Sequence, residues 1–525
     1  MSATEEPTAA AGAEDAPGAE ISPTDELLTR AERIRREMGG ERRIAAMHEA
    51  GRLTAREHID GLIDPGSFRE LGTFARSERP EDRDSTPGEG KIAGRGEIEG
   101  RTVAVIADDI TVKRASTSIV SARKVHHAWE LAERDGVPLV YFGETGGARI
   151  PDIMGSEGFS LMPPPAYMCR RVRRFPVVTV ITGESFGASS FLSAASDLTI
   201  QLPGTCLAIT SPRVIEFATS EQVSMDDLGG PDVHAKTTGQ IDLAAKGPEE
   251  AAAMTRRFLS YLPSNSWTPP PRAESVDAPD GDVGSLVPED RRRAWDMRKL
   301  VKGICDSDSA FELMPEFGRS VVTFLARIDG RPVGVIGSQP MRQAGVLGPD
   351  ACDKATRLIC LCDAYGLPLV FLHDTPGFMV GTGVEHRGLL HKAMLLWEAV
   401  ALAKVPKLAV VVRKSYGVAD YAMCGIGMGA DLLCAWPQAE IGFMDPETAA
   451  NVLFPGEADT EARNQRAREI ALDIAPYGAA GAMRIDEIIA PQSTREVLSA
   501  ALEDVSGRPF QPGCERPLAS WPTSW

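Results

Sequence analysis

The chain carries one long sequence pattern twice. Gly136 and Pro138 return 230 residues later as Gly366 and Pro368. The same spacing joins several further pairs, namely Gly100 and Gly330, Lys124 and Lys354, Pro176 and Pro406, Ser185 and Ser415, and Gly187 and Gly417. Chance similarity does not keep one spacing over so many positions. The sequence therefore predicts a tandem duplication, in which two domains share a fold and place equivalent turns at equivalent points.

Short apolar strands alternate with longer helical segments in each copy. The expected strands are 102–108, 138–143 and 175–182 in the first copy and 332–337, 368–374 and 405–412 in the second. Helices are expected over 121–135 and 353–366. This alternation favours an α/β fold with much parallel strand pairing. The near-continuous Val, Leu and Ile of the strands indicates sheets that are buried on both faces.

Composition divides the chain into four parts. Residues 1–24 are rich in Ala, Pro, Glu and Asp, which predicts a disordered acidic tail. Residues 25–263 form the predicted N-terminal domain, which begins with amphipathic helices over 25–60. A Pro- and Asp-rich linker over 264–286 follows, and residues 287–525 form the predicted C-terminal domain.

The composition is that of a globular protein that binds neither nucleic acid nor a membrane. A net charge of −18 is unfavourable for contact with nucleic acid or an anionic membrane surface. No apolar stretch approaches the ~20 residues of a membrane span, and the N-terminus lacks a signal-peptide pattern. The nine cysteines show no metal-site spacing, so we expect no metal and reduced thiols in a cytoplasmic protein.

One pair of equivalent turns joins a buried strand to a stretch of small residues. The first contains Gly187 and Ala188, and the second contains Gly417 and Ala419. The first turn of a helix has backbone N–H groups without partners inside the helix, and two of them can form an oxyanion hole at the positive end of the helix dipole. Small residues let a ligand carbonyl approach the backbone, but they also permit close packing of helix on strand. The sequence leaves both interpretations open.

A second pair of equivalent turns follows the preceding strand of each copy. Gly146 and Gly147 lie in the first, and Gly377 lies in the second. These glycines are suited to shape a pocket for an acyl chain or a ring. Equally, they suit a tight strand-to-helix turn that needs positive φ.

Several long segments resemble one enzyme family. They include "GGARI", "GRPVGVIGSQP", "CDAYGLPLVFLHDTPGFMVGT" and "VPKLAVVVRKSYG", and the resemblance runs from about Gly51 to Leu502. The chain is similar to the carboxyltransferase (β) subunits of biotin-dependent acyl-CoA carboxylases of the propionyl-CoA and methylcrotonyl-CoA type. The resemblance implies two crotonase-like domains in each chain and a homohexamer. It also implies an active site between the N-terminal domain of one subunit and the C-terminal domain of another.

The resemblance implies a reaction with two oxyanions. A carboxyltransferase of this family moves a carboxyl group from carboxybiotin to the enolate of an acyl-CoA thioester, so two backbone oxyanion holes serve one reaction. Carried onto this chain, the first hole is Gly187 and Ala188, and the second is Val418 and Ala419. No biotinyl-lysine segment is evident in the sequence. A separate biotin carboxyl carrier and a biotin carboxylase are therefore the expected partners.

The resemblance also implies contacts to the acyl-CoA. Lys113 and Arg114 match a loop that reaches the CoA phosphates, and Ala115 and Ser116 match its adenine end. A solvated basic pair is the alternative interpretation of Lys113 and Arg114. Tyr421 occupies a position that tunes acyl selectivity, with core packing as its alternative.

The chain departs from the family pattern mainly in its first half. Ala188 replaces the second residue of a Gly-Gly pair, Arg114-Ala115 replaces another, and residues 151–167 differ from the usual segment. Val418 stands where Gly or Ala is typical. These departures keep two other functions open. One is a biotin-independent decarboxylase or carboxyl transferase acting on a malonyl-type CoA ester, and the other is a non-catalytic structural subunit.

Four further features have weaker functional interpretations. His373 and Asp374 are suited to hydrogen-bond a substrate, but a buried structural role is favoured for the histidine. Arg149 either pairs with a carboxylate or fixes its turn, and His126 and its neighbour are not expected to be ligands. The "RRVRR" run at 170–174 predicts a solvated helix face or a docking surface for an acidic partner.

Overall fold

The protein is seen in a computed structural model that describes residues 22–456 and 459–522. The strands of its first sheet are β1 (Arg69–Leu71), β2 (Lys91–Ile98), β3 (Arg101–Asp108), β4 (Leu139–Thr145), β5 (Val177–Phe186), β6 (Leu198–Gln201), β7 (Cys206–Ala208) and β8 (Leu243–Ala244). Those of its second sheet are β9 (Phe311–Leu313), β10 (Val321–Ile328), β11 (Arg331–Ser338), β12 (Leu369–Thr375), β13 (Lys407–Tyr416), β14 (Leu432–Ala435), β15 (Glu440–Gly442) and β16 (Glu487–Ile488).

The helices of the first half are α1 (Pro23–Glu37), α2 (Glu41–Glu49), α3 (Ala55–Leu62), α4 (Ile119–Asp135), α5 (Ile150–Ile153), α6 (Ser156–Ser160), α7 (Ala166–Cys169), α8 (Ala188–Ala194), α9 (Pro212–Thr219), α10 (Met225–Gly229), α11 (Pro231–Val233) and α12 (Pro248–Tyr261). Those of the second half are α13 (Met297–Ile304), α14 (Pro349–Tyr365), α15 (Thr382–Glu385), α16 (Leu389–Leu402), α17 (Ala419–Ala422), α18 (Pro446–Leu453), α19 (Thr460–Asp473), α20 (Pro476–Gly481) and α21 (Thr494–Ser506).

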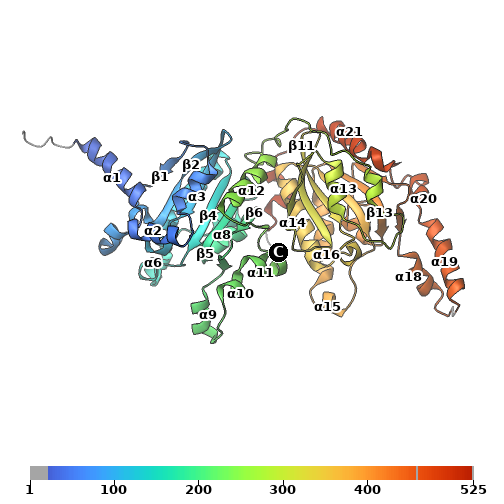
Figure 1. The fold of residues 1–525 in the computed structure, drawn as a ribbon, viewed down its shortest axis with the longest axis horizontal. Coiled ribbons are helices and arrows are strands. Elements are labelled where there is room, and N and C mark those ends of the chain that lie inside the picture. The colour runs from blue at the N-terminus through green and yellow to red at the C-terminus, as the bar shows by residue number, and fades with distance from the viewer. Residues whose placement is uncertain (1–21, 457–458, 523–525) are drawn as a thin grey trace, which may run out of the picture.

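The two sheets have equivalent topology. Their strand orders are β1-β2-β3-β4-β5-β6-β8 and β16-β14-β13-β12-β11-β10-β9, while β7 pairs with β5 and β15 with β13. The pairs β3–β4, β4–β5 and β5–β6 are parallel, as are β11–β12, β12–β13 and β13–β14. The register shifts between Gly143 and Thr145 in one sheet and between His373 and Thr375 in the other. The sheets flank α12 and α14 (Figure 1).

The repeated glycines and prolines mark the same joint in each half. Gly136 and Gly366 adopt the left-handed conformation and end α4 and α14, where a residue without a side chain avoids strain. Pro138 and Pro368 come two residues later, directly before β4 and β12, and their carbonyls accept hydrogen bonds from the N–H groups of Ala104 and Gly334. Proline is tolerated at the start of a strand because no ladder N–H is needed there. The most regular part of the sequence repeat is thus a helix end followed by a strand start.

The repeated lysines are buried and hold backbone carbonyls. The Nζ of Lys124 on α4 donates to the carbonyls of Gly72, Gly88 and Lys91 at 3.0, 3.1 and 2.6 Å. The Nζ of Lys354 on α14 donates to the carbonyls of Phe317 and Val321 at 3.0 and 2.8 Å. Each long helix is therefore tied by one cation to the segment that leads into its sheet.

Buried ion pairs join the two halves. Arg357 of α14 donates to both carboxylate oxygens of Asp242 at 2.8 and 2.7 Å. The hydroxyl of Tyr365 donates to Asp197 at 2.8 Å, and Arg171 donates to the same carboxylate at 2.5 and 2.8 Å. Because α14 has 14 of its 17 residues buried, it belongs to the interior of the molecule and not to the surface of one half.

The solvated helix face predicted at residues 170–174 is wrong. This run is not helical, and Arg171 and Arg173 are each 3% exposed. Arg173 donates to the carbonyls of Leu518, Ala519, Trp521 and Pro522 at 2.9, 3.3, 2.7 and 2.8 Å. Two of the four arginines are therefore used inside the fold: Arg171 pairs with Asp197, and Arg173 holds the C-terminal segment against the first half.

The predicted acidic tail lies mostly outside the described residues. Its last residues begin α1, because the Oγ of Ser22 accepts the N–H of Asp25 at 3.1 Å and thereby caps the helix. The helices expected over 25–60 are α1, α2 and α3.

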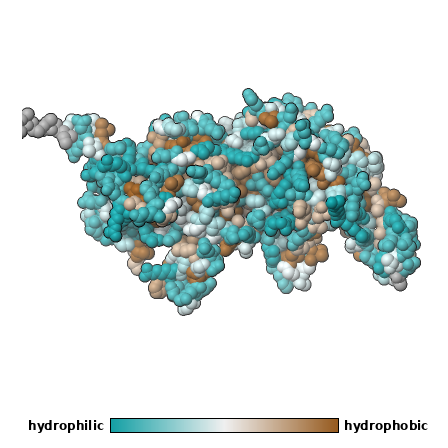
Figure 2. All heavy atoms as spheres, in the orientation of Figure 1, coloured by the Kyte–Doolittle hydropathy of each residue, from teal (hydrophilic) through white to brown (hydrophobic). Residues whose placement is uncertain are grey.

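Several short helices project from the body and carry exposed apolar side chains. Figure 1 shows α9 and α10, α15, and α18 with α19 extending from the same edge, and Figure 2 shows apolar side chains on these projections. Phe217 of α9 is 78% exposed, Val380 next to α15 is 89% exposed, and Leu472 of α19 is 79% exposed. Among the described helices, none combines the length and the apolar character of a membrane span.

Candidate active site

Two strand–turn–helix units occupy equivalent positions in the two halves. β5 ends at Phe186, Gly187 turns the chain at φ 63°, and α8 follows. β13 ends at Tyr416, Gly417 turns the chain at φ 59°, and α17 follows. A positive φ at this point favours glycine, which explains why both copies keep it.

The glycine N–H groups are not free in either unit. Gly187 donates its N–H to the carbonyl of Ile209 at 3.1 Å, and Gly417 donates its N–H to Gly442 at 2.9 Å. These bonds continue the parallel pairing of β5 with β7 and of β13 with β15. The two glycines therefore shape the turns and do not act as donors to a ligand.

The next two amides of each unit lack an acceptor. Within residues 22–456 and 459–522, neither backbone nor side chain accepts the N–H of Ala188 or Ser189, nor that of Val418 or Ala419. The sequence assigned the first pair to Gly187 and Ala188. Because Gly187 donates its N–H to Ile209, the pair of free amides in the first half is Ala188 and Ser189. This pair is equivalent, at the repeat spacing, to Val418 and Ala419. Ser189 was missed, although the repeat spacing pairs it with Ala419.

Side-chain hydroxyls and a carboxylate support these turns from behind. In the first unit, the hydroxyls of Ser185 and Ser189 are 2.7 Å apart, and Ser190 donates to the carbonyl of Gly187 at 2.8 Å. In the second unit, Ser415 donates to Asp420 at 2.7 Å.

The loop expected to contact CoA is strained and lies beside the first unit. Lys113, Arg114 and Ala115 have φ of 48°, 55° and 47°. The Nζ of Lys113 lies 2.9 Å from a carboxylate oxygen of Asp82, and Arg114 donates to Glu184 on β5 at 2.5 Å. The two cations are therefore internally paired at the surface and not simply solvated.

The other two residues of this loop are held by hydrogen bonds, Ala115 by two side chains and Ser116 by a backbone carbonyl. Ala115 is buried, and its carbonyl accepts from the Nζ of Lys91 at 3.0 Å and from Thr145 at 2.9 Å. The hydroxyl of Ser116 donates to the carbonyl of Lys113 at 2.8 Å. These contacts fix the direction in which the two cations leave the loop.

A basic cavity opens next to the loop. It has a volume of about 360 Å³, and Arg43, Arg52, Lys113 and Arg114 line it together with Ala46, Met47, Ala50, Ile110 and Thr111. Guanidinium and ammonium groups suit phosphate oxygens, and the apolar wall suits a ring. Arg43 and Arg52 were missed, because only the fold brings α2 and the segment after it against residues 110–114.

The second pair of glycine turns packs on the strained loops. Gly146 donates its N–H to the carbonyl of Arg114 at 3.0 Å, and Gly147 has φ 93°. Gly377 has φ 138°, and its carbonyl accepts the N–H of Leu347 at 3.0 Å. Arg149 donates to Glu89 at 2.6 Å and to the hydroxyl of Ser116 at 3.2 Å. These contacts agree with tight turns that need positive φ, and Arg149 fixes the first of them.

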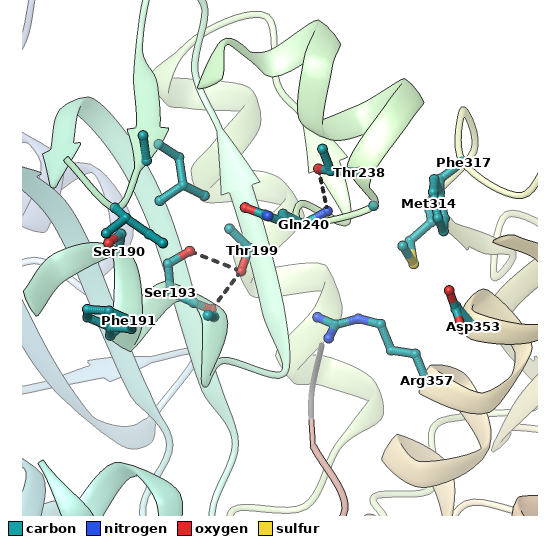
Figure 3. A pocket seen from close by; sticks show the side chains of 15 residues that line it. Ser190, Phe191, Ser193, Thr199, Thr238, Gln240, Met314, Phe317, Asp353 and Arg357 are labelled. Atoms are coloured by element: carbon teal, nitrogen blue, oxygen red, sulfur yellow. Dashed lines mark hydrogen bonds between the residues drawn. The ribbon is translucent and has the colours of Figure 1, made fainter. Parts of the chain in front are cut away.

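A second cavity runs beside α8 toward the other half. It has a volume of about 270 Å³. Figure 3 shows Ser190, Phe191 and Ser193 on one wall and Met314, Phe317 and Arg357 on the opposite wall. The guanidinium of Arg357 pairs with Asp242, and the carboxylate of Asp353 on the same wall pairs with Lys392, so both charges have partners.

Tyr421 is partly buried and partly exposed. Its ring packs edge-on against Trp397 of α16, with 5.4 Å between ring centroids, and the side chain is 39% exposed. One edge of the ring thus contacts the core, and the accessible part leaves the acyl-selectivity role of Tyr421 a prediction.

The buried histidine and its acidic neighbour have internal partners. His373 is fully buried, and its Nδ1 lies 3.0 Å from the hydroxyl of Ser415. Asp374 accepts from the indole N–H of Trp295 at 2.7 Å and from Arg413 at 3.0 Å. Burial lowers the pKa of His373, which favours the neutral ring, although the nearby Asp420 opposes the shift. The structural interpretation of His373 is the one that the contacts favour.

Glu144 was missed by sequence reasoning. Burial raises the pKa of this β4 carboxyl to about 7, although Arg52 donates to it at 2.5 Å and opposes the shift. Asp374, its equivalent at the repeat spacing, also has a raised pKa through burial. An acidic residue directly precedes Thr145 in one copy and Thr375 in the other, and this repetition could have revealed the two buried acids.

No group of side chains suited to a metal ion occurs among the described residues. The ring of His126 packs on Tyr167 with 4.5 Å between centroids.

Comparison with known proteins places the whole pattern in one family. The carboxyl transferase domain model matches residues 46–510. The propionyl-CoA carboxylase carboxyltransferase subunit of Haloferax mediterranei is 35% identical over 90% of this chain and 94% of its own length. The methylmalonyl-CoA decarboxylase subunit alpha of Veillonella parvula is 34% identical over 88% of this chain and 92% of its own length.

A solved structure has the same fold. The transcarboxylase 12S structure, with methylmalonyl-coenzyme A and methylmalonic acid bound, has a TM-score of 0.87 and 33% identity. The match covers 93% of this chain and 96% of that one. This likeness and the two equivalent sheets confirm the predicted tandem duplication of crotonase-like α/β domains. The chain belongs to the carboxyl transferase family.

Proposed function

We propose that this chain is the carboxyltransferase subunit of an acyl-CoA carboxylase. It transfers a carboxyl group from carboxybiotin, carried on a partner protein, to the α-carbon of an acyl-CoA thioester. The observation that carries the proposal is the two equivalent pairs of free amides, Ala188 with Ser189 and Val418 with Ala419. A reaction between an enolate and a ureido group develops charge on two oxygen atoms, and the duplicated fold offers two places to hold them.

Each amide pair acts as an oxyanion hole. The N–H groups belong to the first turn of α8 or lie at the start of α17, where the helix dipole adds positive potential. Preorganised donors of this kind lower the barrier because they need no reorientation as charge develops, and one such donor typically contributes ~3 kcal/mol.

The basic cavity beside the first unit is the proposed site for CoA. Arg43, Arg52, Lys113 and Arg114 surround an apolar wall, which suits the phosphates and the adenine ring of CoA. Lys113 and Arg114 must exchange their contacts to Asp82 and Glu184 for phosphate oxygens when CoA binds. The surface ion pairs that they give up are individually weak.

The second unit fits a biotin ureido oxygen on two counts. The amides of Val418 and Ala419 lack acceptors, and the exposed side chain of Val418 leaves the turn open. When bound there, biotin supplies the carboxyl group and takes up the substrate proton. Val418 and Ala419 hold the ureido oxygen, while the carboxylate of Asp420, the next residue, is engaged by the hydroxyl of Ser415 and the N–H of Ile426.

The partners and the assembly follow from the family. We propose a separate biotin carboxyl carrier, a biotin carboxylase and a homohexamer. The transcarboxylase 12S protein forms a hexamer assembly, and the apolar projections of this chain offer surface for contacts between subunits. All nine cysteines are free thiols and most are buried, which is typical of the reducing cytoplasm.

A biotin-independent decarboxylase is the second candidate. The similarity to a methylmalonyl-CoA decarboxylase subunit supports the decarboxylation of a malonyl-type CoA ester, and it leaves the role of biotin to experiment. One enolate hole is sufficient for that reaction.

The reverse half-reaction separates the two candidates. The purified chain is given malonyl-CoA, methylmalonyl-CoA or methylglutaconyl-CoA, with and without free biotin, and loss of the carboxyl group is followed by mass spectrometry. The proposal expects loss that depends on biotin. Loss without biotin would support the decarboxylase, and no loss with any ester, with or without biotin, would contradict both functions.

A paired substitution tests the first hole directly. Ala188 is the first residue of α8, where proline fits the helix and removes only the N–H. Ala188→Pro is expected to lower kcat by about 10²–10³-fold, while Ala188→Gly, which keeps the N–H, stays near the parent value. Equal activity of the two variants would exclude Ala188 as a donor.

A further inference from the structure

Three buried polar side chains lie behind the second amide pair. His373 comes from β12, Ser415 from β13 and Asp420 from α17. The Nδ1 of His373 is 3.0 Å from the Oγ of Ser415, which is 2.7 Å from the Oδ1 of Asp420. The exposed fractions are 0%, 0% and 7%, so this His373–Ser415–Asp420 chain is closed to solvent.

The two hydrogen bonds of the His373–Ser415–Asp420 chain are donated in the same direction, from the histidine toward the acid. Ser415 donates its hydroxyl hydrogen to Asp420, so its oxygen accepts the Nδ1–H of His373. In a hydrolytic triad the histidine lies between serine and acid and takes the serine proton. Here serine lies between histidine and acid and is buried, so the three residues do not form a nucleophile.

Asp420 connects the start of α17 to the loop that follows it. Its Oδ2 accepts the N–H of Ile426 at 2.8 Å, and its carbonyl accepts the N–H of Gly425 at 2.8 Å. A Cβ on Gly425 would lie 2.1 Å from the carboxylate, so a larger residue has no room there. The carboxylate thus holds strand, helix and loop at one point.

The first half has no such chain. The repeat spacing equates His373 with Gly143 and Asp420 with Ser190, so both the ring and the acid are absent from the first copy. α8 has seven residues, whereas α17 has four. A four-residue helix makes few hydrogen bonds of its own and needs tertiary contacts to keep its shape. The added side chains occur in the half where the helix is too short to hold its amides unaided.

We infer that His373, Ser415 and Asp420 are positioning residues for the amides of Val418 and Ala419. The inference rests on the proposed function of those amides as an oxyanion hole. Asp420 follows them directly in the chain, and Ser415 lies three residues before them on β13. Any relaxation of the carboxylate therefore tilts both donors, and hydrogen-bonded support of this kind is what keeps a site within its productive geometry.

Substitutions at His373 separate positioning from general stability. His373→Leu removes the donor to Ser415, whereas His373→Asn keeps an N–H where Nδ1 was. Since a misplacement of about 1 Å can cost about 100-fold, we expect His373→Leu to lower kcat about 100-fold, with KM for the acyl-CoA within about twofold of the parent and His373→Asn within about tenfold of the parent kcat. The matched control is Thr323→Val, which removes a buried hydroxyl bonded to the carbonyl of Leu313 at 2.9 Å in the same half.

A second measurement does not depend on turnover. Hydrogen exchange of peptides spanning residues 414–426 is compared in the parent, His373→Leu and Thr323→Val. Faster exchange in His373→Leu alone supports positioning, even if the parent has no carboxyl-transfer activity and the proposed function fails. The inference is overturned if exchange in this segment is unchanged. It is also overturned if, in an active parent, His373→Leu and Thr323→Val lose kcat equally.

Discussion

At the scale of single residues, the site depends on which N–H groups are already used. Gly187 was the natural choice for a donor because it stands where small residues are expected, yet its N–H continues the pairing of β5 with β7. Ser189 was overlooked because a serine side chain does not indicate whether the backbone N–H of the residue is free. Hydrogen bonds of the backbone cannot be read from residue types, so the exact donors had to come from the structure.

Glu144 gives a pH-dependent prediction. Its folded pKa of about 7 lies above the ordinary 4.5, so the folded state keeps a proton that the unfolded state loses. The stability that this group contributes is fully present below pH 4.5 and is lost as the pH rises through 7. Relative to the parent, Glu144→Gln should gain ~3 kcal/mol in the free energy of unfolding between pH 4.5 and 8. Urea denaturation at both pH values measures this, and a constant difference between the proteins would contradict it.

At the scale of elements, the residues that recur in both copies are those that end helices, start strands or hold backbone carbonyls from inside the fold. The glycines that end α4 and α14 and the prolines that start the next strands were visible in the sequence, and they predicted the α/β order correctly. Residues 170–174 were misread, because a run of arginines resembles a surface whenever its partners are distant in sequence. Those partners, the carbonyls of residues 518–522, lie about 345 residues away.

The buried lysines give a prediction at this scale. Lys124→Met and Lys354→Met each leave backbone carbonyls without a donor, at a cost of ~2–4 kcal/mol in the free energy of unfolding. Lys124 should be the more costly, because it serves three carbonyls and Lys354 serves two. Chemical denaturation at pH 7 measures both, and the exposed Lys302→Met is the control. The reverse ranking would show that hydrogen-bond number does not decide the effect.

At the scale of the whole molecule, the halves are joined by buried polar contacts that neither half can make alone. Arg357 crosses to Asp242, Tyr365 crosses to Asp197, and Arg173 holds the C-terminal segment. The sequence predicted two domains and the family but not these contacts, since they depend on how the copies pack. The same limit applies to the basic cavity, where Arg43 and Arg52 meet residues from a distant loop.

Arg173 gives a prediction about the C-terminal segment. Arg173→Met removes four hydrogen bonds to this segment and should lower the free energy of unfolding by ~3 kcal/mol. Subtilisin should then cleave within residues 516–521, as followed by mass spectrometry of the intact chain. Arg174→Met, at a half-exposed neighbour, is the control. Cleavage of Arg173→Met at the parent rate would show that Leu518 and Ala519 hold the segment by packing alone.

The capture of residues 518–522 by Arg173 also has a consequence for biosynthesis. Arg173 leaves the ribosome 345 residues before the first of its carbonyl partners. At a typical rate of chain growth this is a delay of roughly 20–70 s, during which the first half can already form its sheet. The carboxylate of Asp197, 3.5 Å from the guanidinium in the same half, can hold the charge of Arg173 during this delay, whereas the four carbonyl acceptors arrive only with the end of the chain.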